Sequence, residues 1–233
     1  MGKNKIRKFR ELNSFKNVLQ PRFDEILRSP FRLKGKWREE YFGNDHPVVL
    51  ELGCGKGEYT VSLAERYPLV NFIGVDLKGS RIWTGARYAI DHDLRNVAFI
   101  RTRIEFIGSF FGKDEVDEIW LTFPDPQLKR KRTKKRLTSP LFLEMYRQFL
   151  KENGIIHLKT DNSELFEFTR KLALKNDFRT HSITENLYSS EIEGAAKEIK
   201  TYYEKQFLDK GMNIYYISFS FNHGTKIEES SAG

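Results

Sequence analysis

The sequence contains a single cysteine, Cys54, and only five histidines in 233 residues. One cysteine excludes an internal disulfide and an all-cysteine zinc site, and it is typical of a protein from a reducing compartment. The histidines and the cysteine show no metal-ligand spacing, so we expect no metal site. No apolar run approaches the length of a membrane span, and the first twenty residues lack the apolar core of a secretory signal. We therefore expect a cytoplasmic protein.

Positive charge is concentrated in two segments of the chain. The net charge is +8, and seven of the eight residues in 129–136 are Lys or Arg. Residues 1–16 hold six more Lys or Arg against Glu11, which leaves the rest of the chain mildly acidic. Concentrated charge suits nucleic acid, because a phosphate backbone rewards local cation density by releasing counterions. The simpler alternative is a solvated surface segment.

Short apolar runs alternate with helical patterns from residue 46 onward, which predicts an α/β fold with a doubly wound, mostly parallel sheet. We assign residues 21–222 to a single domain. Residues 1–20 form either a short amphipathic helix or a flexible basic arm that orders on nucleic acid, and residues 223–233 form a disordered tail. The expected strands are 48–52, 71–76, 97–100, 117–123, 154–159, 178–186 and 213–221, and the main helices follow residue 57, span 79–91 and 140–151, and run from 163 to about 175.

Acidic residues stand at the ends of four of these strands. They are Glu51, Asp76, Asp125 and Asp161. The carboxyl ends of parallel strands meet at one edge of a sheet, and open α/β sheets bind their ligands there. We therefore expect the four carboxylates to line one site.

The glycines at positions 53, 55 and 57 follow a strand and precede a helix. A phosphate-binding P-loop needs four residues between its first Gly and the Gly-Lys pair, and Lys56 comes too soon. A dinucleotide fingerprint needs its third glycine where Glu58 stands. A nucleoside ligand without phosphates remains, with Asp76 placed to accept its ribose hydroxyls and Glu51 to take a cationic amine. S-adenosylmethionine (SAM) has both groups, whereas an ordinary tight turn is the alternative for the loop alone.

Five segments carry a resemblance to a known family: ELGCGKG (51–57), GVD (74–76), FPDP with the basic run (123–136), HLKTDN (157–162) and TYYEKQF (201–207). In this order and spacing the chain resembles the bacterial tRNA (guanine-N7-)-methyltransferases of the TrmB type, from about residue 48 to 221. The resemblance implies a Rossmann-like class I methyltransferase with an antiparallel late strand. It also implies methyl transfer from SAM to N7 of a guanosine in the tRNA variable loop.

The resemblance implies roles for individual residues. Asp125 matches the proposed catalytic acid and also a cofactor contact. Three departures from the family pattern lie beside the sites. Gln127-Leu128 replaces Trp-Pro, Arg103 replaces an Asp near the adenine, where Glu105 could substitute, and the third is at Asp76. Asp76 stands where many relatives have Glu. The implied cofactor residues are Glu51, Gly53, Gly55, Gly57, Asp76, Glu105 and Asp125, and the implied substrate residues are Lys129, Asp161, Thr201 and Glu204.

The chemistry of the reaction constrains these roles. Guanine N7 carries a lone pair and no proton, so Asp125 suits an orienting, charge-stabilising role better than general-base catalysis. Asp161 or Glu204 could accept the N1–H and N2–H₂ donors of guanine. The alternatives are that Asp161 only caps a helix and that Thr201 and Glu204 lie exposed on a surface helix.

We expect tRNA as the partner and a monomer or weak homodimer as the acting form. Two other functions remain open at this point. A non-catalytic basic RNA-binding protein on the same fold is suggested by the changes at Gln127-Leu128 and Arg103. A small-molecule methyl- or aminopropyltransferase would leave the cationic run unexplained.

Overall fold

The computed structural model describes residues 3–224 and 226–229. The chain divides into two compact units, Met1–Val116 and Asp117–Gly233. Assignment of residues 21–222 to a single domain stays a prediction. The described residues contain eight strands with helices between them, which confirms the mixed α/β class. None of the described helices is long and apolar enough to cross a membrane.

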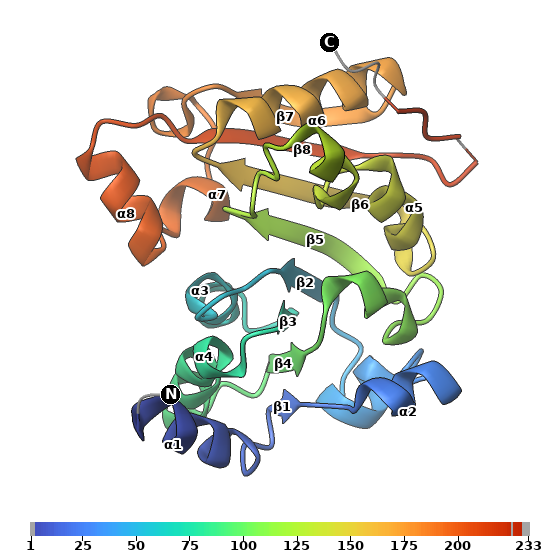
Figure 1. Ribbon diagram of the computed structural model, residues 1–233, viewed down its shortest axis with the longest axis vertical. Coiled ribbons are helices and arrows are strands. Elements are labelled where there is room, and N and C mark those ends of the chain that lie inside the picture. The colour runs from blue at the N-terminus through green and yellow to red at the C-terminus, as the bar shows by residue number, and fades with distance from the viewer. Residues whose placement is uncertain (1–2, 225, 230–233) are drawn as a thin grey trace. The chain divides into compact units, whose positions relative to one another are not determined.

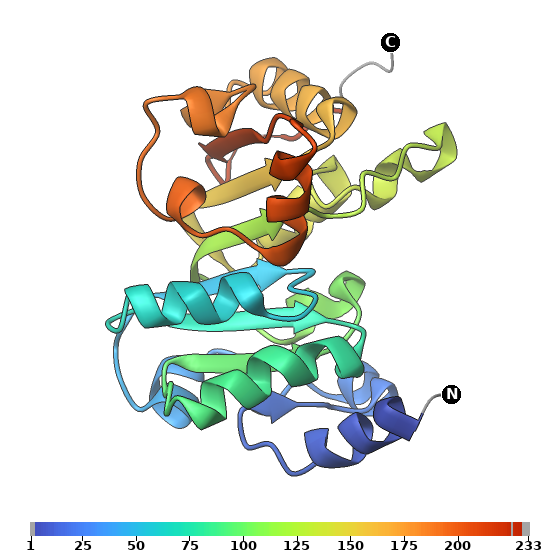
Figure 2. The same ribbon diagram turned by 90° about the vertical axis from the view of Figure 1, so that its left-hand side faces the viewer.

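The first unit contains a parallel sheet with the strand order β1-β4-β3-β2. Every residue of β2 is buried, as expected for a central parallel strand covered on both faces. Figure 2 shows α3 and α4 lying across the same face of β2, β3 and β4. Each strand therefore ends in a loop that leads into a packed helix or turn. The elements are α1 (Lys3–Leu12), β1 (Val18–Leu19), α2 (Phe23–Arg28), η1 (Trp37–Phe42), β2 (Val48–Leu52), α3 (Glu58–Arg66), β3 (Asn71–Asp76), α4 (Gly79–Asp91), β4 (Val97–Arg101) and η2 (Ile104–Ser109).

The basic N-terminal segment adopts the helical alternative, as α1. Leu12 at its end is fully buried, and Phe15 just beyond it is buried as well. The indole Nε1 of Trp83 on α4 donates to Oε2 of Glu11 at 2.9 Å. The helix is thus fixed to the domain, and residues 1–2 lie outside the described residues.

The second unit has the strand order β5-β6-β8-β7, and β8 runs antiparallel to both of its neighbours. This confirms the antiparallel late strand. The predicted helix 140–151 is wrong at its end, because α5 stops at Tyr146 and β6 already begins at Leu150. Figure 1 labels these elements. They are β5 (Val116–Thr122), η3 (Arg130–Lys135), α5 (Pro140–Tyr146), β6 (Leu150–Thr160), α6 (Ser163–Lys175), β7 (Arg179–Thr184), η4 (Leu187–Ser189), α7 (Ala195–Glu198), α8 (Tyr202–Asp209) and β8 (Tyr215–Ser220).

Part of the predicted disordered tail lies against α6. The side-chain amide of Asn176 donates to the backbone oxygen of Glu228 at 3.0 Å and accepts from its backbone nitrogen at 2.6 Å. Ile227, which precedes Glu228 in the chain, is buried. Residues 226–229 therefore pack on the domain, while residues 225 and 230–233 lie outside the described part of the tail.

Candidate active site

The end of β2 is tied to the end of β3 by backbone hydrogen bonds. The amides of Gly53 and Cys54 both donate to the carbonyl oxygen of Val75, at 2.8 and 3.0 Å. Glu51, two residues before Gly53 on β2, is 3% exposed. Its Oε2 accepts a hydrogen bond from the Thr60 hydroxyl on α3. Glu51 is therefore a buried carboxylate that joins β2 to α3, and its predicted role toward an amine stays a prediction.

The three glycines of the loop all have positive φ, of 83°, 56° and 74°. They differ in the space around them. A Cβ on Gly57 would lie 2.7 Å from Cε1 of Phe99, whereas a Cβ on Gly53 or Gly55 would meet no atom within 4 Å. Gly57 is thus required for packing at the start of α3, and the other two supply a backbone conformation that L side chains rarely adopt.

Asp76 bonds this loop with one carboxylate oxygen and its own following turn with the other. Oδ2 accepts from the Gly55 amide at 3.0 Å, and Oδ1 accepts from the Lys78 amide at 2.7 Å. A carboxylate has about four acceptor positions, so two remain for ligand hydroxyls.

Burial raises the pKa of the Cys54 thiol, and the charges of Glu51 and Asp76 raise it further. Cys54 is therefore a protonated packing residue.

Arg103 forms an ion pair with Glu105, the residue expected to take the place of the missing acid near the adenine. Its Nη2 lies 3.2 Å from Oε1 of Glu105, and both side chains are largely exposed. The pair stands directly after β4, where the Thr102 amide donates to the Asp76 carbonyl at 3.2 Å. A positive and a negative group thus share this position, and the predicted adenine-side role of Glu105 remains a prediction.

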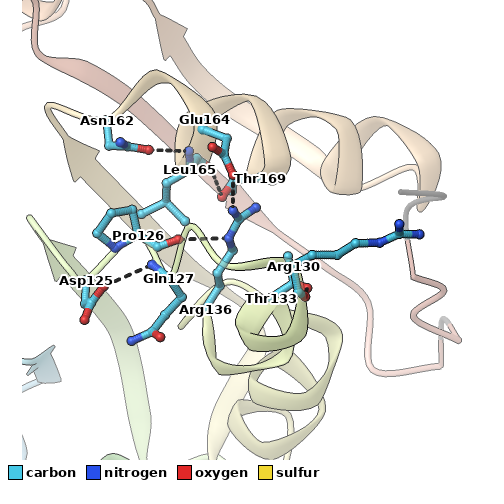
Figure 3. A network of polar contacts seen from close by, with 10 residues as sticks. All are labelled: Asp125, Pro126, Gln127, Arg130, Thr133, Arg136, Asn162, Glu164, Leu165 and Thr169. Carbon is cyan, nitrogen blue, oxygen red and sulfur yellow. Dashed lines mark hydrogen bonds and ion pairs between the residues drawn. The ribbon is translucent and has the colours of Figure 1, made fainter. Parts of the chain in front are cut away.

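In the second unit, Asp125 lies on an exposed turn after β5. The chain turns at Phe123, whose φ is 48° and whose amide donates to the Lys159 carbonyl at 2.8 Å. Oδ1 of Asp125 accepts from the Gln127 amide at 3.0 Å, a bond drawn in Figure 3. Flanking prolines and this side-chain bond limit the conformations of the turn. Asp125 is therefore a solvent-accessible carboxylate in a restrained position.

The residues that depart from the family pattern are placed differently. Gln127 also has a positive φ of 48°, and its Oε1 is buried without a hydrogen-bond partner among the described residues. Leu128, next in the chain, is 55% exposed. The position where the resemblance implies a Trp is therefore taken by Gln127, and the exposed Leu128 stands where it implies a Pro.

The cationic run has two parts. Six of its side chains are exposed, and these lie on or next to η3. Arg136 is instead 3% exposed: its Nε donates to the Pro126 carbonyl at 3.0 Å, and its Nη2 lies 2.5 Å from Oε1 of Glu164 on α6 (Figure 3). Assignment of Arg136 to the phosphate-holding set is thus wrong, because its guanidinium fastens the Asp125 turn to α6. The exposed cations are Lys129, Arg130, Lys131, Arg132, Lys134 and Lys135.

Asp161 does not cap α6. The cap is Asn162, whose Oδ1 accepts from the Leu165 amide at 2.8 Å. The Asn162 amide in turn donates to the hydroxyl of Thr160 at 3.1 Å. Asp161 is left half-buried at the end of β6, and its predicted contact with the substrate stays open to test.

Thr201 and Glu204 form a capping box at the start of α8. The Glu204 amide donates to Oγ1 of Thr201 at 3.3 Å, and the Thr201 amide donates to Oε2 of Glu204 at 3.2 Å. Glu204 is 0% exposed, and its Oε1 lies 2.6 Å from Nζ of Lys159 and accepts from the Tyr188 hydroxyl at 2.5 Å. The alternative of an exposed Glu204 is wrong, because both of its oxygens are bonded inside the protein, and the substrate contact implied for Thr201 and Glu204 stays a prediction.

Lys159 and Tyr188 were not anticipated as part of this cluster. Burial lowers the pKa of Lys159, against the opposing effect of Glu204, and burial followed by the bond to Glu204 raises the pKa of Tyr188. The available signal was a lysine inside the apolar run GIIHLK, where an inward charge requires a partner. Among the described residues, no group of His, Cys, Asp and Glu is arranged to hold a metal ion.

The comparisons with known proteins identify the family. Residues 45–217 match a family model described as "Putative methyltransferase". A Bacteroides thetaiotaomicron protein named tRNA (guanine-N(7)-)-methyltransferase is 53% identical over 94% of this chain and 86% of its own length. This chain belongs to the tRNA (guanine-N(7)-)-methyltransferase family. Another relative of that name in the family, from Christiangramia forsetii, is 52% identical over 94% of this chain and 98% of its own length.

Solved structures show that this family member has a methyltransferase fold. The crystal structure of the 16S rRNA methyltransferase KamB matches with a TM-score of 0.59 and 13% identity, over 80% of this chain and 91% of KamB. A 30S ribosomal A1408 methyltransferase from an uncultured bacterium matches with a TM-score of 0.53 and 16% identity, over 94% and 95% of the two chains. The predicted class I fold is confirmed.

Proposed function

We propose that this protein transfers a methyl group from SAM to N7 of a guanosine in the tRNA variable loop. The observation that carries the proposal is the 53% identity to a tRNA (guanine-N(7)-)-methyltransferase over 94% of the chain. Since tRNA is the substrate, the proposed compartment is the cytoplasm. The proposed acting form is a monomer or a weak homodimer.

Residues of the first unit fit the methyl donor, which supplies an electrophilic methyl group on a sulfonium. Asp76 keeps acceptor positions for two ribose hydroxyls while it holds the Gly55 amide. Added Cβ atoms at Gly53 and Gly55 would meet nothing, so the backbone there can be approached closely. The loop lacks the P-loop arrangement for phosphates, which favours a nucleoside of this kind. Three further residues of the first unit support the same proposal. Glu51 is a buried carboxylate that joins β2 to α3, Gly57 packs at the start of α3, and Glu105 is the proposed acid on the adenine side.

Residues of the second unit fit the acceptor. Methylation places a positive charge on the imidazole ring of guanine, and the exposed carboxylate of Asp125 would stabilise that charge as it develops. Holding N7 in line with the methyl carbon can lower the barrier by about 7 kcal/mol or more. Asp161, freed from capping by Asn162, would accept the N1–H and N2–H₂ groups that distinguish guanine from adenine. The target base leaves its stack to reach these groups.

The six exposed cations at Lys129–Lys135 fit the phosphates beside the target base. Backbone contacts of this kind position a nucleic acid without reading its sequence. These cations follow directly after the Asp125 turn in the chain. Attraction for the phosphates of any RNA would thus act next to the residue proposed to act on guanine.

Nucleoside mass spectrometry tests the proposal. Unmodified tRNA is incubated with the protein and SAM, digested, and compared with standards for guanosine methylated at N7, N1 and N2. The proposal predicts 7-methylguanosine alone. Methylation at N1 or N2, or of small molecules in the absence of RNA, contradicts it.

Calorimetry with SAM separates the enzyme from a non-catalytic RNA-binding protein on the same fold. The enzyme binds SAM with a Kd well below 1 mM, about the range of typical substrate affinities. Absence of heat at millimolar SAM, with tRNA binding retained, favours the non-catalytic alternative.

A further inference from the structure

A groove of about 800 Å³ lies in the second unit between the segment η3–α5 and helix α6. Its two walls are joined by the Arg136–Glu164 ion pair, which Figure 3 shows beside the Asp125 turn. Leu128, three residues beyond Asp125, lines the groove. The groove therefore adjoins the turn that carries the proposed catalytic carboxylate.

Apolar and aromatic side chains make one part of this lining. Leu128 and Leu141 both line the groove and are 55% and 59% exposed. The ring of Phe168 on α6 lies under the Arg136 guanidinium, with 4.6 Å between the guanidinium carbon and the ring centroid. Arg136 itself is 3% exposed and holds the Phe168 ring in place, so Phe168, Leu128 and Leu141 are the groups against which an unpaired base can pack.

The charges of the lining favour an anionic ligand. Arg130 and Lys171 are exposed and have no ion-pair partner among the described residues. The three carboxylates of the lining are instead paired: Glu164 with Arg136, Glu167 with Arg170 at 2.7 Å, and Glu229 with Lys134 at 3.5 Å. Free cations beside neutralised acids leave donors for phosphate oxygens.

We propose that this groove binds an unpaired nucleotide of the tRNA that flanks the target guanosine. Its base packs against Leu128, Leu141 and Phe168, and its phosphate is held by Arg130 and Lys171. The inference rests on the proposed function, which places the guanosine at Asp125. Contacts to flanking nucleotides set the sequence context of enzymes that act on extruded bases, so this groove would set which loops are accepted.

Binding measurements with exposed-residue variants test the groove. Leu128→Ser with Leu141→Ser should weaken the Kd for a fluorescent tRNA about tenfold, because the base loses apolar contact with the two side chains. Lys171→Gln should reduce the slope of log K against log salt by about 1. The matched control is Lys113→Gln, an exposed lysine outside the groove, and SAM affinity should stay unchanged in every variant. Effects no larger than those of the control overturn the proposal.

A photocrosslink identifies the nucleotide. p-Benzoylphenylalanine placed at position 141 should crosslink to an unpaired nucleotide in the tRNA variable loop, as mapped by primer extension. A crosslink to a paired stem, or none, overturns the groove assignment. Wild-type protein that methylates no guanosine overturns the proposed function, whereas the crosslink position still decides the groove.

Discussion

Asp125 combines exposure with restraint, because prolines flank it and its Oδ1 accepts from the Gln127 amide. Such a carboxylate can meet a developing cation without the cost of reorganising at the moment of reaction. Its neighbour Arg136 holds the same turn through the Pro126 carbonyl. The charge of Asp125 is therefore available while its position is fixed by other groups.

Asp125→Asn tests the charge without removing the turn. We expect kcat to fall by about 100-fold or more, as when one charge-stabilising group is lost, with the tRNA Kd within about twofold of wild type. Rapid-quench single-turnover rates and fluorescence binding measure the two quantities. Asp209→Asn, at an exposed carboxylate on α8, is the matched control. A parallel loss of rate and tRNA affinity would instead assign Asp125 to binding.

Glu204 belongs to a motif that the sequence shares with the family, yet its side chain is fully buried. Its carboxylate is paired with Lys159 and capped by Tyr188 in the interior. We expect Glu204→Ala to lower the free energy of unfolding by about 3–5 kcal/mol, because it removes the carboxylate that pairs with the buried Lys159 ammonium. The double change Lys159→Met with Glu204→Leu should recover much of that loss. Urea unfolding supplies both values. Unchanged stability with lost guanosine affinity would instead support the substrate role.

The sequence could identify the carboxylates but not their partners. Asp76 and Asp161 follow directly from the ends of strands, since strand ends are set by local apolar patterns. Arg136 looks the same in the sequence as the six exposed cations before it. Its burial depends on Glu164 and Phe168, which approach only through tertiary packing. Long-range pairing of this kind leaves no local signal.

At the scale of elements, the glycine loop depends most on Gly57. We expect Gly57→Ala to lower the free energy of unfolding by about 2–4 kcal/mol, from strain at positive φ together with the overlap on Phe99. SAM binding should weaken as the start of α3 shifts. Gly211→Ala is the matched control, because its φ is also 70° and its added Cβ meets nothing. Equal losses in both variants would show that backbone strain alone accounts for the effect.

Elements with clear periodicity were predictable, and their ends were less so. The buried strands β2 and β3 have the predicted bounds, 48–52 and 71–76. The run after Pro140 suggests a helix through residue 151, yet Leu150 already pairs in β6. Apolar residues such as Phe149 serve either element, so periodicity alone does not set the boundary.

At the scale of the whole molecule, the cationic run should dominate attraction to RNA. Changing Lys131, Arg132 and Lys135 together to Gln should weaken tRNA binding and reduce the salt slope by about 2–3. Arg136→Gln should leave that slope nearly unchanged and lower the unfolding free energy by about 1–3 kcal/mol, since the buried side chain loses its bond to the Pro126 carbonyl and its packing on Phe168. Salt titrations and urea unfolding separate the two. A triple variant with wild-type affinity would make the run a solvated surface.

Buried tyrosines should limit stability in alkaline solution. Burial raises the pKa of Tyr216 to about 12, from about 10 in the unfolded chain. The native state therefore holds a proton that the unfolded state loses between pH 10 and 12, so this contribution is complete below pH 10 and disappears as pH rises to 12. Tyr216→Phe should make the fall in unfolding free energy between pH 9 and 12 shallower. A fall as steep as that of the wild type contradicts the assignment.

The position of the methyl group tests the account most directly. Guanosine methylated at N7 is labile, and reduction followed by aniline treatment cleaves the RNA chain at that nucleotide. The account predicts one new cleavage, in the variable loop, after wild-type protein acts on unmodified tRNA, and little or none with Asp125→Asn. Cleavage at another loop, or methyl incorporation without any cleavage, would contradict it.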